Sequence, residues 1–103
     1  MFHHGWSDQE RGVHVKSLTP DGNDISIIYN GLLAKSGAQQ VYLHCGYGDP
    51  ARWRTVEDFR MQKVPDGWKK TLNIEEGQMT FCFHDNADHW DNNSGHNWSY
   101  RVI

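Results

Sequence analysis

Hydrophobic and polar residues alternate along most of this chain in short runs, as they do in β-strands with one buried face. The clearest run is residues 68–74, where Trp68, Leu72 and Ile74 fall on one side and polar residues on the other. Such runs end in turn-forming clusters, for example the Asp-Gly-Asn-Asp of residues 21–24. The pattern predicts about seven strands, at residues 12–18, 25–29, 40–47, 59–63, 68–74, 78–84 and 97–103.

Sustained helical periodicity is missing, and only residues 32–39 and 56–61 could form a helical turn. Short strands with turns between them are typical of an antiparallel sandwich. The 103 residues suit one domain, without a linker or a repeat. We therefore expect an all-β fold, a single immunoglobulin-like antiparallel β-sandwich over residues 1–103. Residues 1–20 form either an N-terminal extension or the first strand.

Aromatic residues are more frequent than the polar composition suggests. Mean hydropathy is -0.80, yet 13% of the residues are aromatic and five are Trp. Some of these rings must therefore build the core, and others can form an exposed contact surface. Trp68 and Trp98 share strand faces with Leu72 and Tyr100, which predicts a core position for both. Trp6 lies in a terminus expected to fray, and it receives no role.

Charge and cysteine content exclude several functions. The net charge is -3 and the basic residues are scattered, which argues against nucleic-acid binding. No apolar run is long enough to span a membrane. The start of the chain lacks a signal-peptide pattern, so we expect a cytoplasmic protein if the chain is complete. Cys45 and Cys82 are either free thiols or a single bridge.

Two tryptophans stand among polar residues outside the predicted strands. Trp90 lies in the long polar connection 84–96, and a connection of this length is usually functional or disordered. Trp53 also has polar neighbours, and it follows a strand whose outward face carries Tyr42 and His44. Together these side chains could form a sugar-binding surface.

The chemistry of a glucose ring fits such a surface. One face of the ring presents C–H bonds that stack on electron-rich aromatic faces, and its rim presents hydroxyls. Asn, Asp and His side chains supply donors and acceptors for those hydroxyls. Because a helical α-glucan turns its successive rings, two aromatics set at an angle would select it over a flat cellulose chain.

Spaced residues along most of the chain resemble a known group of carbohydrate-binding modules. The pattern is His44-x-Gly46, Trp53, Met61, Gly67-Trp68, Phe81-x-Phe83-x-Asp85, Trp90-Asp91-Asn92-Asn93 and Asn97-Trp98. It resembles the starch-binding modules of families 25 and 53. Its Trp-Asp-Asn-Asn ending is also similar to the glycogen-targeting modules of family 21.

The resemblance implies non-catalytic binding of α-1,4-linked glucans: starch, glycogen or maltooligosaccharides. It implies a platform of His44, Trp53 and Trp90, with hydrogen bonds from Asn92 or Asn93 to glucose hydroxyls. No catalytic residue, cofactor or metal is implied. A carbohydrate-active enzyme is the protein partner that this function suggests.

Other functions are weighed against this one. Trp53 and Trp90 could anchor a protein partner in a protein-interaction module, which Arg52 and Arg54 favour, whereas the polar run after Trp90 suits hydroxyls better. Catalysis on a glycoside would need two carboxylates across a cleft, but the candidate acids Asp85, Asp88 and Asp91 share one loop. We expect Asp91 to brace that loop by accepting backbone N–H bonds.

A metal site would draw on the same segment. Its candidate ligands are the three acids above together with His84, His89 and His96. The histidine spacings fit no zinc pattern, and the glycine and glutamate of an EF-hand loop are missing. We therefore predict no metal, with calcium as the alternative because oxygen-rich Asp/Asn loops can hold it.

Overall fold

The computed structural model describes residues 5–49 and 51–102. Over these ranges the chain forms ten strands and one helical turn. The elements are β1 (Trp6–Asp8), β2 (Val13–Ser17), β3 (Asp24–Tyr29), α1 (Leu32–Lys35), β4 (Val41–Tyr47), β5 (Arg54–Arg60), β6 (Gln62–Val64), β7 (Gly67–Asn73), β8 (Gln78–Asp85), β9 (Trp90–Asp91) and β10 (Trp98–Arg101).

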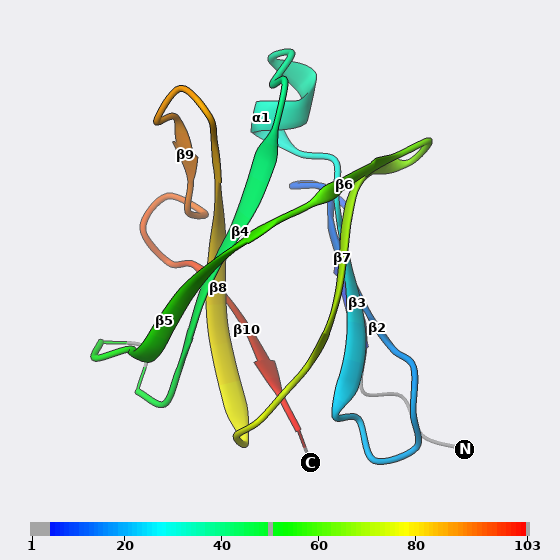
Figure 1. The fold of residues 1–103 in the computed structure, drawn as a ribbon, viewed down its shortest axis with the longest axis vertical. Helices are drawn as coiled ribbons and strands as arrows, with labels where there is room; N and C mark the ends of the chain where they lie inside the picture. The colour runs from blue at the N-terminus through cyan, green and yellow to red at the C-terminus, as the bar shows by residue number, and fades with distance from the viewer. Residues whose placement is uncertain (1–4, 50, 103) are drawn as a thin grey trace.

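The strands form two antiparallel sheets that pack face to face (Figure 1). The first sheet has the order β1-β2-β3-β7-β6, and the second has the order β10-β8-β4-β5 with β9 paired to β8. The predicted all-β sandwich is therefore confirmed. The strand number is ten among the described residues, rather than about seven, because short pairings were not visible in the alternation.

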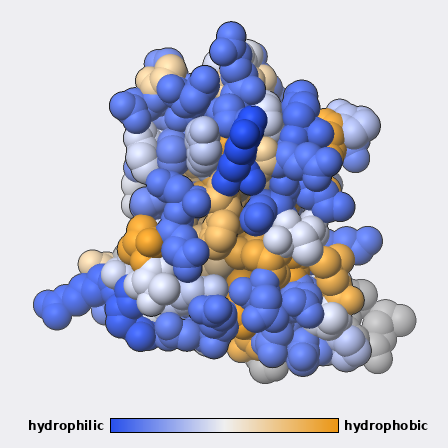
Figure 2. Space-filling view, viewed as in Figure 1, coloured by the Kyte–Doolittle hydropathy of each residue, from blue (hydrophilic) through white to orange (hydrophobic). Residues whose placement is uncertain are grey.

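The core lies between the two sheets and is built from the alternating residues that face inward. Tyr29 of the first sheet stacks on Phe83 of the second, with ring centroids 4.1 Å apart. Trp68 and Trp98 are buried, as predicted. Figure 2 shows one face of the molecule, where hydrophilic residues surround a more hydrophobic centre and lower half.

Two predictions about the strands were wrong. Trp6 is not frayed: it pairs with Val15 in β1, and its ring stacks on Phe81 at 6.2 Å. The predicted strand 59–63 is split at the buried Met61, where the chain passes from β5 in one sheet to β6 in the other. β5 begins as early as Arg54, over part of a candidate helical turn. Its side chains are mostly exposed because it is an edge strand, so hydrophobic alternation did not reveal it.

The cysteines are free and buried, so the single bridge is excluded. Cys45 pairs with Phe81, while Cys82 pairs with His44 in the same two strands. Because side chains alternate along a strand, Cys45 faces the core and Cys82 faces the opposite side of the sheet. A disulfide between them would need their side chains to point towards each other.

The one helical element confirms the prediction for residues 32–39. α1 is a four-residue turn that leads into β4 and contacts the segment around β9. Among the residues that the structure describes, no helix is long and apolar enough to cross a membrane.

Candidate functional site

The outer face of the second sheet carries a row of aromatic and imidazole rings. Along β4 the core residues alternate with Tyr42 and His44, which are half-buried on the outer face. The neighbouring strand β8 pairs His84 with Tyr42, so that their rings stack with centroids 5.0 Å apart and planes 13° apart. Strand register thus places three rings side by side.

Trp90 covers part of this row. β9 pairs with the end of β8, which sets Trp90 opposite His84. The indole centroid lies 4.4 Å from the His84 ring and 5.1 Å from the His44 ring, to which it is nearly perpendicular at 88°. The side chain nevertheless keeps 46% of its surface exposed, so it can contact a ligand.

Trp53 reaches the same row from the other side. Its ring is half-buried and lies 5.6 Å from His44, with the two planes 36° apart. A glycine permits this approach: a Cβ atom on Gly46 would lie 2.8 Å from Trp53 Cβ. We call Tyr42, His44, Trp53, His84 and Trp90 the aromatic platform.

The structure thus brings together four residues that the sequence predicted for the site, Tyr42, His44, Trp53 and Trp90. His84 was missed as a platform residue. Because side chains alternate along a strand and Phe83 points inward, His84 was expected on the outer face. Only the pairing of β8 with β4 shows that His84 lies beside Tyr42.

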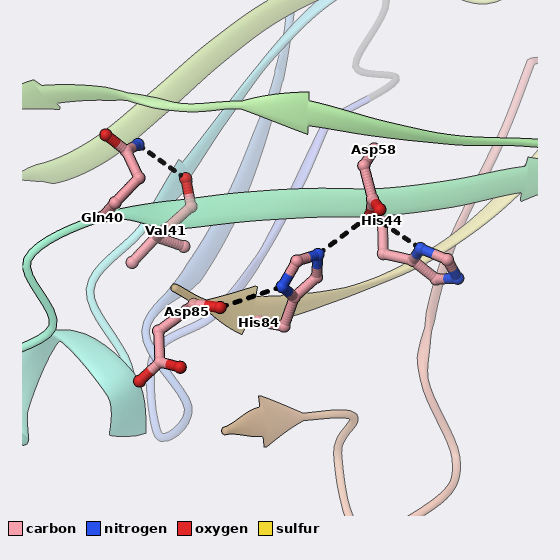
Figure 3. A network of polar contacts seen from close by, with 6 residues as sticks. All are labelled: Gln40, Val41, His44, Asp58, His84 and Asp85. Carbon is pink, nitrogen blue, oxygen red and sulfur yellow. Dashed lines mark hydrogen bonds and ion pairs between the residues drawn. The ribbon is translucent and has the colours of Figure 1, made fainter. Parts of the chain in front are cut away.

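Asp58 of β5 connects the two histidines (Figure 3). Its Oδ1 lies 2.8 Å from His44 Nδ1 and 3.0 Å from His84 Nε2. Burial by itself would raise the pKa of Asp58, but the hydrogen bonds from the two histidines outweigh burial and hold that pKa below its ordinary value. The carboxylate therefore keeps its negative charge beside the two histidines of the platform.

Asp85, rather than Asp91, braces the loop that precedes Trp90. Its Oδ1 accepts hydrogen bonds from the backbone N–H groups of Ala87 and His89, and its Oδ2 lies 2.9 Å from His89 Nδ1. Burial raises the pKa of Asp85, but these hydrogen bonds lower it by more.

Asp91 has a different partner from the one predicted. Its Oδ2 accepts a hydrogen bond from the Tyr29 hydroxyl at 2.6 Å, and the same hydroxyl accepts one from Leu33 N–H at 3.0 Å. The buried tyrosine thus fastens the residue next to Trp90 to the start of α1. The expectation of backbone N–H donors to Asp91 was wrong.

Asn92 and Asn93 hold the turn that follows β9. Asn92 Oδ1 accepts from Gly95 N–H, and Asn93 Nδ2 donates to the Asn97 carbonyl. Asn93 and Asn97 adopt positive φ angles of 58° and 57°, which asparagine tolerates better than most residues. Over residues 5–49 and 51–102, the other side-chain amide atoms, Asn92 Nδ2 and Asn93 Oδ1, form no further hydrogen bond.

A groove of about 820 Å³ borders the platform between α1 and residues 85–90. Trp90 lines it together with Leu32, whose side chain is 62% exposed. Trp90 therefore belongs both to the platform and to the lining of this groove.

The histidines and acids of segment 84–96 are not gathered into one metal-like group. His89 pairs with Asp85, and Asp91 pairs with Tyr29. Over residues 5–49 and 51–102, the group with metal-like spacing is His44, Asp58 and His84, which come from three different strands.

Comparison with known proteins agrees with this arrangement. Residues 25–81 match the family model described as a starch/carbohydrate-binding module (family 53). The alpha-amylase of Clostridium acetobutylicum is 38% identical over 81 residues, which cover 76% of this chain and 10% of that protein. This chain therefore spans about a tenth of the amylase's length. No solved structure matches the chain significantly.

Proposed function

The chain belongs to the family 53 starch/carbohydrate-binding modules, and we propose that it binds an α-glucan on the aromatic platform. Modules of this family bind the glucan without catalysing a reaction. The family 53 part of the resemblance is confirmed, while the likeness to families 25 and 21 stays a prediction. The matched residues 25–81 include His44 and Trp53 but end before Trp90. The contact of Trp90 with both histidines supports its place in the same site.

The observation that carries this proposal is the inclination of the two indoles around His44. The Trp53 plane makes 36° with the imidazole and the Trp90 plane makes 88°, so the two indoles cannot be parallel. Successive glucose rings of an α-1,4-linked chain are also turned against one another. Each indole can then stack on the C–H face of a different glucose unit.

Polar groups at the edge of the platform complete the site. Asn92 and Asn93 follow Trp90 within three residues, and each keeps an amide atom that is not used in the turn. His44 has Nδ1 directed at Asp58, which leaves Nε2 for a glucose hydroxyl. Such neutral hydrogen bonds with stacking give shallow sites of modest affinity, with Kd values of roughly 1 μM to 1 mM.

The protein-interaction alternative, with Trp53 and Trp90 as anchors, is not favoured by the family membership. A link to a carbohydrate-active enzyme is consistent with the amylase relative. We propose that the domain holds such an enzyme close to its polysaccharide. Starch, glycogen and maltooligosaccharides all present the α-1,4 linkage that the platform would bind.

A calorimetric titration with maltoheptaose tests the platform. Cellohexaose, whose glucose units are β-linked, is the control for the linkage. We expect Trp53→Ala and Trp90→Ala each to weaken maltoheptaose binding at least about tenfold, or about 1.4 kcal/mol, while circular dichroism shows a folded sandwich. Leu18→Ala is the matched control, because Leu18 is 47% exposed, as Trp90 is 46%, but lies beyond β2 in the other sheet. Undiminished binding by either tryptophan variant would show that the glucan lies elsewhere.

A further inference from the structure

Three adjacent strands direct nitrogen and oxygen ligands at one point on the outer face of the second sheet. His44 of β4 and Asp58 of β5 are cross-strand partners, and His84 lies on β8 at the other side of β4. One ligand atom from each of the three residues lies within 4.8 Å of the others. Figure 3 shows both imidazole rings turned towards the Asp58 carboxylate.

The second nitrogen of His84 determines what can occupy this point. His84 Nδ1 lies 3.0 Å from the backbone carbonyl oxygen of Asp85, and a carbonyl oxygen only accepts hydrogen bonds. The proton of the neutral ring is therefore on Nδ1, and Nε2 carries a lone pair. In that tautomer the lone pair faces the negative Asp58 Oδ1 at 3.0 Å, and a cation between the two atoms would bind both of them.

We propose that His44 Nδ1, Asp58 Oδ1 and His84 Nε2 bind a divalent transition-metal ion such as Zn²⁺. A metal-bound histidine usually donates its other ring N–H to a carbonyl or a carboxylate, as His84 does to Asp85. Two imidazoles and one carboxylate suit Zn²⁺, Ni²⁺ or Cu²⁺ better than Mg²⁺ or Ca²⁺, which prefer oxygen ligands.

Binding a metal would move the three ligand atoms, of which the two histidine nitrogens lie within 4.8 Å of each other. Ligands of a tetrahedral zinc ion are about 3.3 Å apart, because each lies about 2.0–2.2 Å from the metal. The two contacts of Asp58 Oδ1, at 2.8 Å and 3.0 Å, would each lengthen by a few tenths of an ångström. The Asp58 side chain is 49% exposed, so the ion can enter from solvent and keep a water as its fourth ligand.

The site is part of the floor of the aromatic platform. His44 contacts both indoles, and His84 stacks between Tyr42 and Trp90. A metal on the two imidazoles would restrict the movement of these rings. The metal would also put the proton of neutral His44 on Nε2, so that this atom changes from an acceptor to a donor.

Calorimetric titration with ZnCl₂, without sugar, tests the site independently of glucan binding. We expect the wild-type chain to bind one Zn²⁺ with a micromolar Kd and to show no binding of Mg²⁺. Asp58→Asn and His84→Gln should each weaken Zn²⁺ binding at least about tenfold, because each removes one ligand. Circular dichroism checks that both variants fold.

Two control variants separate this site from other histidines. His14→Gln changes a half-buried histidine of the other sheet that bonds Ser7, and the double change His3→Gln/His4→Gln removes the adjacent pair near the start of the chain. Both should keep the wild-type Kd. Loss of Zn²⁺ binding in the His3/His4 variant, or unchanged binding in Asp58→Asn and His84→Gln, would overturn the proposal. A wild-type Kd weaker than about 1 mM would also overturn it.

Discussion

The hydroxyl of Tyr29 is one atom on which the position of Trp90 depends. It donates a hydrogen bond to Asp91, and it accepts one from the backbone N–H of Leu33 in α1. Tyr29→Phe removes this oxygen and keeps the ring, so the stacking on Phe83 is preserved. The variant therefore isolates the contribution of two hydrogen bonds that join β3, α1 and β9.

The size of the effect follows from the burial of the partners. Leu33 is buried, and its N–H would lose its hydrogen bond without access to water. Leaving a buried donor unsatisfied costs about 1–3 kcal/mol, and a hydrogen bond to a charged group contributes about 1.5–3 kcal/mol. Asp91 is only half-buried and can form a hydrogen bond to water instead, so the loss of its bond to Tyr29 costs less free energy. We expect the free energy of unfolding to fall by about 2–4 kcal/mol, within the stability of an ordinary domain.

Urea unfolding followed by circular dichroism measures this loss, and calorimetry with maltoheptaose measures its effect on the site. Because β9 is loosened, maltoheptaose affinity should fall by up to about tenfold, or about 1.4 kcal/mol. Tyr100→Phe is the matched control, since the Tyr100 hydroxyl is also buried but donates to the Gly22 carbonyl, at 2.8 Å, and not to Asp91. That variant should lose about 1 kcal/mol of stability and keep its affinity.

The reasoning is refuted if Tyr29→Phe is destabilised no more than Tyr100→Phe. In that case the bridge from α1 to β9 would contribute little, and the position of Trp90 would depend on strand pairing alone. Unchanged maltoheptaose affinity with a large loss of stability would separate the fold from the site, and it would contradict the proposed bracing of Trp90.

Two further predictions concern Gly46 and the thiols. A Cβ atom at Gly46 would lie 2.8 Å from Trp53 Cβ, so Gly46→Ala should displace Trp53 and weaken maltoheptaose binding at least about threefold in calorimetry. Gly77→Ala is the control, because a Cβ atom there meets no atom within 4 Å, and it should leave the affinity unchanged. Equal affinities of the two variants would contradict the close approach of Gly46 to Trp53. Burial raises the pKa of Cys45 and of Cys82 to about 12 from 9.0, so both thiols should react slowly with iodoacetamide at pH 8 until urea unfolds the chain. Because the unfolded thiols ionise first, stability should fall as the pH rises above 9, and a urea midpoint that does not fall between pH 8 and pH 10 would contradict this expectation.

The sequence was sufficient where a strand has one buried face. In β4, β7 and β8 hydrophobic residues alternate with polar ones, and all three strands were predicted within one residue at each end. β5 was not predicted from Arg54 onwards, because an exposed edge strand has no buried face to produce alternation. β9 has only two residues, too few for any periodic pattern.

The same contrast holds for the site. Alternation in β4 placed Tyr42 and His44 on the outer face, and polar surroundings marked Trp53 and Trp90 as candidates for an exposed role. These inferences depend only on the identity of the residues next to each position in the sequence. The family resemblance added that His44, Trp53 and Trp90 could act together on a glucan, and their contacts on the platform support this proposal.

Only the tertiary structure brought Asp58 and His84 to His44. Asp58 is 14 residues from His44 in the chain and 26 from His84, yet one carboxylate oxygen contacts both rings. Strand order and register decide this meeting, and both depend on how the two sheets pack their inner faces together. Local sequence determines which way each side chain points from its strand, whereas packing between distant segments determines which side chains become neighbours.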